Sequence, residues 1–116
     1  MIVYVNELSG AALDWAVAKC EKNWVLELSS FIPNHDLGRM NYSTDWSQGG
    51  PILEREHMHI DCLRVADHYR SSVWEAWPYN GGTKLIQQGP TPLIAAMRCY
   101  IASKLGDSVD VPDELL

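Results

Sequence analysis

The stretch that decides the fold is Thr91-Pro92-Leu93-Ile94-Ala95-Ala96-Met97-Arg98-Cys99-Tyr100-Ile101-Ala102-Ser103-Lys104-Leu105. Thr91 suits the N-cap, and Pro92 suits the first helical position, where a missing N–H costs nothing. Lys104 suits the negative end of the helix dipole, and Gly106 is a natural helix-ending residue. Apolar side chains surround this segment almost completely. We therefore expect a C-terminal helix over about residues 91–105 that lies across a sheet and buries most of its surface.

The segment before this helix predicts the sheet. Ile60–Val65, Ser72–Trp77 and Thr83–Gln88 have the composition of strands. Asn80-Gly81 separates the last two and is a strong signal for a type I′ hairpin turn. The sequence thus predicts a three-stranded antiparallel meander over about residues 60–88.

The N-terminal part predicts a strand and a helix. Ile2–Val5 is a short β-branched and aromatic run, and Ser9 is a good N-cap for a helix over about residues 9–22. We expect Asp14 on the solvated face of this helix, and a further short strand at Trp24–Leu28. The expected core face repeats at helical spacing through Leu13, Ala16, Val17, Cys20 and Trp24.

The polar stretch Tyr42–Glu56 joins these two halves. Ser43 or Thr44 is expected to cap a short middle helix over about residues 44–57, with Asp45 in its first turn. Pro51 either begins the helix proper or kinks a longer one. The acidic tail, Asp107–Leu116, either packs back on the domain or reaches a partner.

Together these elements predict an α+β fold with helices packed on an antiparallel sheet, in a single domain over residues 1–116. The chain has 47% apolar and 21% charged residues, which is typical of a globular protein. The net charge of −6 argues against a nucleic-acid partner. No apolar run is long enough for a membrane span, and no cofactor motif is present. The odd, well-separated cysteines indicate free thiols in a reducing cytosol.

One motif has the spacing of metal ligands. In a strand, His57, His59 and Asp61 would share one face, and these residue types suit zinc. The pattern is similar to the H-x-H-x-D-H motif of metallo-β-lactamase-type hydrolases, with Cys62 in place of the last histidine. That fold implies a chain about twice as long, and the later ligands have no counterpart. Metal binding is the less favoured interpretation.

The candidate binding surface lies in the polar stretch. Trp46 sits among polar residues and is either a plug over a core edge or an interface anchor. The glycines lack the lysine of a phosphate-binding loop, so they indicate a tight turn or a close helix approach. The candidate binding residues are Tyr42, Ser43, Asp45, Trp46, Gln48, Gly49 and Gly50.

Three ordered blocks carry a family resemblance: Leu8–Lys19, Tyr42–Trp46 with Gly49–Ile52, and Gly89–Tyr100. They resemble the NinX-like family of tailed-phage and prophage proteins, and more loosely the phage ABA-sandwich proteins. The resemblance implies a small phage or prophage accessory protein in the cytoplasm of the host cell. It brings no catalytic residues.

Two functions follow as hypotheses. The first is a non-enzymatic module that binds an unidentified host or phage protein through the polar stretch, with no membrane or nucleic acid involved. An exposed apolar patch would also allow a homo-oligomer. The alternative is a small-ligand-binding protein or enzyme that uses Tyr42–Glu56 with His57 or His59 as acid or base.

Overall fold

The computed structural model describes residues 1–21, 40–64, 72–79 and 85–116, and every structural statement below refers to these ranges. The fold is α+β, as the sequence predicted. Its elements in chain order are β1 (Ile2–Tyr4), η1 (Val5–Glu7), α1 (Gly10–Cys20), α2 (Trp46–Arg55), β2 (His59–Arg64), β3 (Val73–Trp77), β4 (Gln87–Gly89), α3 (Pro92–Leu105), β5 (Ser108–Asp110) and η4 (Asp113–Leu115).

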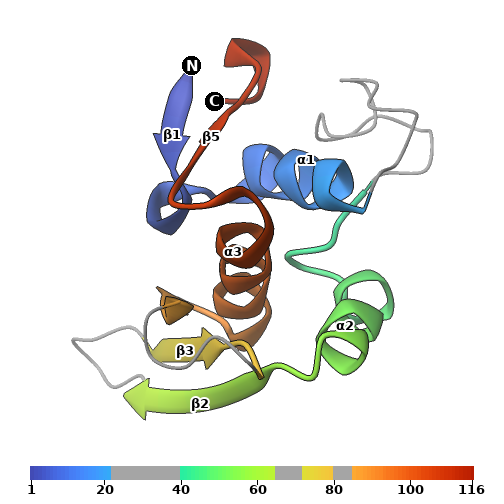
Figure 1. Cartoon of the computed structure of the whole chain (residues 1–116), viewed down its shortest axis with the longest axis vertical. Coiled ribbons are helices and arrows are strands. Elements are labelled where there is room, and N and C mark those ends of the chain that lie inside the picture. Colours follow the sequence, from blue (N-terminus) through green and yellow to red (C-terminus); the bar gives the residue numbers. More distant parts are fainter. Residues whose placement is uncertain (22–39, 65–71, 80–84) are drawn as a thin grey trace.

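Helix α3 is the centre of the molecule. It runs between the three-stranded sheet at one end and α1 at the other, with α2 beside it (Figure 1). The Oγ of Thr91 accepts a hydrogen bond from the N–H of Ile94 at 3.1 Å, and the helix ends at Gly106 with φ of 89°. Both predicted caps are therefore confirmed. The buried residues of α3 are Leu93, Ala95, Ala96, Met97, Cys99, Tyr100, Ile101 and Ala102.

The predicted meander is confirmed as an antiparallel sheet in the order β2-β3-β4. His59 pairs with Trp77 between the first two strands, and Trp74 pairs with Gly89 between the last two. Strand β4 begins later than the predicted Thr83, and the expected Asn80-Gly81 turn lies outside the described residues.

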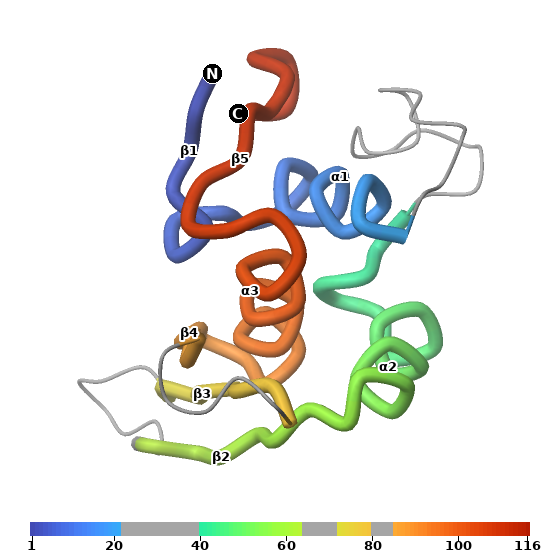
Figure 2. Tube along the Cα trace, in the orientation of Figure 1, coloured from blue at the N-terminus to red at the C-terminus, as the bar shows by residue number. Residues whose placement is uncertain are grey.

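The two ends of the chain form a second, two-stranded sheet. β1 pairs antiparallel with β5, so that the terminal segments lie side by side (Figure 2). The sequence left open whether the acidic tail packs back on the domain or reaches a partner. In the structure, the tail packs back on the domain. Its apolar residues Val109, Val111 and Leu115 are buried in the core.

Helix α1 differs from the prediction. Ser9 occupies the N-cap position, as expected, although its side chain makes no capping hydrogen bond. Every residue from Ala12 to Ala18 is buried. The expectation that Asp14 lies on a solvated face is wrong, because its side chain is only 4% exposed. Trp24 and the strand predicted at Trp24–Leu28 lie outside the described residues.

A polar cluster connects the three helices at one side of the core. It consists of Glu21, Arg55, Glu56, Tyr100 and Lys104. Arg55 on α2 forms a two-pronged pair with Glu21, at 3.0 and 2.7 Å, just after α1. Tyr100 on α3 donates its hydroxyl to the same carboxylate. Arg55 also contacts Glu56, which lies 3.3 Å from the Nζ of Lys104 on α3. The hydrogen bond from Arg55 is the main cause that lowers the pKa of Glu21 and of Glu56.

This cluster should make stability fall in acid. A carboxyl whose pKa is lowered by folding stabilises the protein above its unfolded pKa, here about 4.5, and loses that effect as pH falls through the lower folded value. Because Arg55 is half exposed, solvent screens its pairs, and Arg55→Met should cost about 1 kcal/mol at pH 7. Chemical denaturation at pH 7, 5 and 3 should show a smaller acid loss for Arg55→Met than for the unaltered chain. Equal losses would contradict a role for the cluster in the pH dependence.

Candidate functional site

The predicted binding stretch is anchored by a buried hydrogen bond between distant segments. The backbone N–H of Ser43 donates to Oδ1 of Asp14 on α1 at 2.8 Å. Ser43 is 2% exposed, and its hydroxyl has no hydrogen-bond partner among the described residues. A buried carboxylate must be paired, and here it satisfies a buried backbone donor. Ser43 is therefore part of the core rather than of a free binding surface. Its backbone N–H also explains why Asp14 is buried, because the carboxylate of Asp14 is the acceptor for this donor.

Asp45 caps helix α2. Its Oδ1 accepts hydrogen bonds from the N–H of Ser47 at 2.9 Å and from the hydroxyl of Ser47 at 2.7 Å. The bond from the Ser47 hydroxyl is the main cause that lowers the pKa of the Asp45 carboxyl. The prediction that Ser43 or Thr44 caps this helix, with Asp45 inside its first turn, is wrong by one or two residues. Pro51 lies inside the helix rather than at its start.

Gln48 and Gly49 hold α2 against its neighbours. The Oε1 of Gln48 accepts a hydrogen bond from the N–H of Asn41 at 2.7 Å. Gly49 is buried, and a Cβ at this position would lie 2.2 Å from the carbonyl oxygen of Tyr42 and 2.7 Å from Cδ1 of Leu93. The absence of a side chain lets α2 approach α3 this closely.

Trp46 is the most exposed of the seven candidate binding residues. It is the first residue of α2, and 53% of its surface is accessible. Gly50 lies beneath it, since a Cβ on Gly50 would be 3.6 Å from Cε3 of Trp46. Tyr42 is half-buried and packs against the core. Among the tryptophans in the described ranges, Trp46 is the one that exposes more than half of its surface.

The structure does not bring the histidines to the start of α2. His57 follows the end of that helix with φ of 53°, so about ten residues of helix, roughly 15 Å, separate it from Asp45. His57 lies outside strand β2, whereas His59 lies in it and stacks on Trp77 with ring centroids 5.3 Å apart. Within the described ranges, no group of three His, Cys, Asp or Glu side chains is placed to hold a metal.

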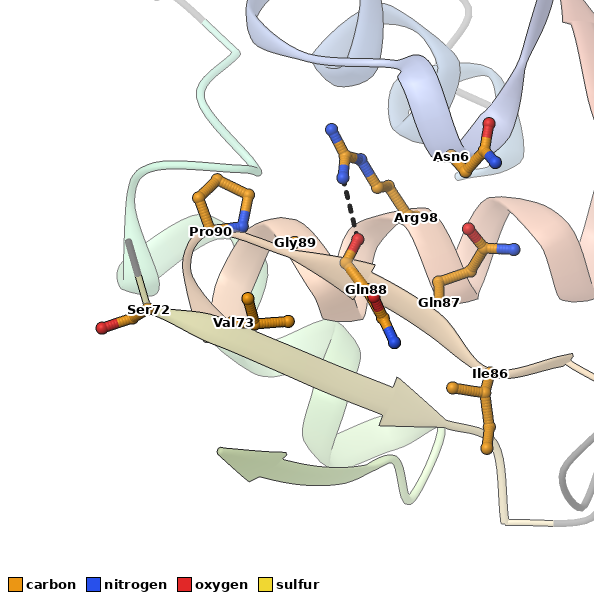
Figure 3. Close-up of a pocket in the computed structure, with 9 residues that line it drawn as sticks. All are labelled: Asn6, Ser72, Val73, Ile86, Gln87, Gln88, Gly89, Pro90 and Arg98. Atoms are coloured by element: carbon orange, nitrogen blue, oxygen red, sulfur yellow. Dashed lines mark hydrogen bonds between the residues drawn. The ribbon is translucent and has the colours of Figure 1, made fainter. Parts of the chain in front are cut away.

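A second candidate site was missed in the sequence. The Arg98 pocket is a depression of about 590 Å³ between η1, β3, β4 and α3 (Figure 3). Its lining residues are Asn6, Ser72, Val73, Ile86, Gln87, Gln88, Gly89, Pro90 and Arg98. The available signal was Arg98 itself, a charged residue in the middle of α3, where its neighbours in the sequence are apolar.

Arg98 is held in a fixed orientation by the backbone. Its Nε donates to the carbonyl oxygen of Leu8 at 2.8 Å, and its Nη1 donates to the carbonyl oxygen of Gln88 at 2.8 Å. Figure 3 shows the guanidinium above β4, with Asn6 and Gln87 on one side and Pro90 on the other. Burial lowers the pKa of Arg98, while the group stays charged at neutral pH.

Two of the thiols, Cys20 and Cys99, lie in surroundings that disfavour the nucleophilic thiolate. All three cysteines are free. Burial raises the pKa of Cys20 to about 11 and that of Cys99 to about 12, so both are thiols at neutral pH.

Within the described ranges, no helix has the length and apolar character to cross a membrane.

Contacts in the structure join all three sequence blocks to one another. Asp14 in the first block binds Ser43 in the second, and Gly49 in the second packs against Leu93 in the third. Arg98 in the third block donates a hydrogen bond to the carbonyl oxygen of Leu8 in the first block. The blocks thus define a packing unit built from α1, α2 and α3.

A comparison with known families finds a match. A family model described as "Bacteriophage P22, NinX" matches residues 4–104, which include all three blocks. The chain belongs to this phage NinX family. No curated protein matches the chain.

The Asp14–Ser43 hydrogen bond should be essential for stability. Asp14→Ala leaves the buried N–H of Ser43 without its acceptor and should lower the free energy of unfolding by about 1–3 kcal/mol. Asp14→Asn retains a carbonyl acceptor and should lose less. Ser43→Ala removes only the unpartnered hydroxyl and should change little. Urea denaturation of the three variants tests this order, and a Ser43→Ala loss as large as that of Asp14→Ala would contradict it.

The adjacent glycines of α2 should respond oppositely to alanine. Gly49→Ala forces its Cβ against Tyr42 and Leu93 and should cost about 1–3 kcal/mol. Gly50→Ala makes only an ordinary contact with Trp46 and gains helix propensity, so it should stabilise by about 0.5–1 kcal/mol. Thermal and urea unfolding of the matched pair measures both effects. Equal changes of the same sign would show that α2 and α3 are not packed as described.

Proposed function

We propose that the chain is a non-enzymatic protein-binding module of a phage or prophage, acting in the cytoplasm of the host cell. Its partner is a host or phage protein that takes Trp46 as an anchor. The observation that carries this proposal is the 53% exposure of Trp46 on a helix that is otherwise tightly fixed. Tryptophan is among the residues most often found as interface hot spots.

The rigidity of its surroundings supports Trp46 as an anchor. Asp45 caps the helix at the preceding residue, and Gly49 locks the helix against α3. The Trp46 ring lies over Gly50 at the surface. A partner can therefore contact the ring without any rearrangement of the core. A preorganised aromatic loses little conformational entropy on binding, which favours affinity.

The same contacts narrow the binding surface proposed from the sequence. Ser43 and Gly49 are buried, and Asp45 and Gln48 use their side chains to build the turn and the helix. We therefore propose Trp46 as the anchor, with Tyr42 at its edge. The alternative of an enzyme built from this stretch and His57 or His59 gains no support from the separation of these groups along α2.

Trp46→Ala should weaken partner capture without unfolding the chain. Affinity capture from phage-infected host cells with the unaltered chain should retain a specific protein, and Trp46→Ala should weaken its binding at least about tenfold. Tyr79→Ala is the matched control, because Tyr79 is 67% exposed and belongs to a different surface beside His57. Thermal unfolding should confirm that both variants are folded. Undiminished capture by Trp46→Ala would overturn this site.

A further inference from the structure

The two arginines whose contacts are described differ in how their charge is compensated. Arg55 has carboxylate partners in Glu21 and Glu56. Arg98 is half-buried and has no carboxylate partner among the described residues; its hydrogen bonds go to the carbonyl oxygens of Leu8 and Gln88. Carbonyl groups orient a guanidinium but leave its net charge in place. Among the described residues, the Arg98 pocket therefore contains an oriented positive charge that no carboxylate contacts.

The guanidinium keeps donors for a ligand. Its fork carries more N–H groups than the two carbonyl contacts use, and the Nη edge matches the planar geometry of a carboxylate. Because the backbone already fixes the side chain, little further rotamer entropy is lost when a ligand binds. These are the properties of an anion-binding arginine.

The rest of the pocket limits the type of anion. Asn6, Gln87 and Gln88 add neutral amides, which both donate and accept hydrogen bonds. Asp107 lines an adjoining depression together with Asn6 and Gln87, and the whole chain carries a net charge of −6. A dianion is disfavoured by this field, whereas a single negative charge can be matched by Arg98 alone.

We propose that the Arg98 pocket binds a small monocarboxylate that carries a hydrogen-bonding group, such as an amide, next to the carboxylate. Arg98 takes the carboxylate, and the amides of Asn6, Gln87 and Gln88 take the neighbouring polar group. No residue of α2 lines the pocket, so this site is separate from the proposed Trp46 surface.

Titration of the full chain followed by NMR tests this site. The probe is N-acetylglycine, with its uncharged amide and inorganic phosphate as controls. We expect saturable shifts of the Arg98 Nε–H signal and of the backbone amides of Gln87–Gly89, with a dissociation constant in the millimolar range. The uncharged amide should give no saturable shift, and phosphate should bind more weakly than N-acetylglycine.

Asn6→Asp is the decisive variant. It places a negative charge in the pocket, where it repels the carboxylate of the probe, and leaves both carbonyl contacts of Arg98 intact, so the affinity for N-acetylglycine should fall about tenfold or more. Thr44→Asp adds the same charge at an exposed position outside the pocket and should leave the affinity nearly unchanged. Arg98→Gln should remove binding, but it also removes the hydrogen bonds from α3 to Leu8 and to Gln88 in β4, so the thermal unfolding of this variant must be measured as well.

Several results would overturn the proposal. The first is the absence of any saturable shift with N-acetylglycine. The second is an equal response to the uncharged amide or to phosphate. The third is an affinity that falls equally in Asn6→Asp and Thr44→Asp, which would show a general charge effect rather than a site.

Discussion

The structure depends on one buried hydrogen bond, from the backbone N–H of Ser43 to the carboxylate of Asp14. It joins α1 to the turn that starts α2, across 29 positions of the chain. This turn sets the direction of α2, so that Gly49 packs against Leu93 on α3. If the bond is lost, both a carboxylate and a backbone donor remain buried without each other, which costs more than an exposed contact would.

The sequence was sufficient to predict the elements with strong local signals. Thr91 and Pro92 start α3, Gly106 ends it, and the meander follows from alternating strands. Asp14 was placed wrongly because helical periodicity assigns a charged residue to solvent, and its acceptor role is defined only when Ser43 packs against it. The pairing of β1 with β5 likewise depends on contacts between the two ends of the chain, which local patterns do not encode.

The candidate site shows a similar division. The polar stretch around Trp46 was recognisable, yet most of its polar groups form the cap and the turn of α2 rather than a free surface. The Arg98 pocket was not recognised, because its lining comes from four elements that only the fold brings together. The three blocks that resemble the phage NinX family meet through Asp14, Gly49 and Arg98, so these blocks form a packing unit. We therefore expect the functional residues to lie at the exposed edges of this packing unit.

The most direct test of this account is hydrogen exchange at the backbone amide of Ser43. If its N–H is held by Asp14 in the core, it should exchange about as slowly as the buried amides of α3, such as that of Ile101, and its protection should disappear in Asp14→Ala. Fast exchange of Ser43 in the unaltered chain, at the rate of an exposed turn, would contradict the central role of this hydrogen bond.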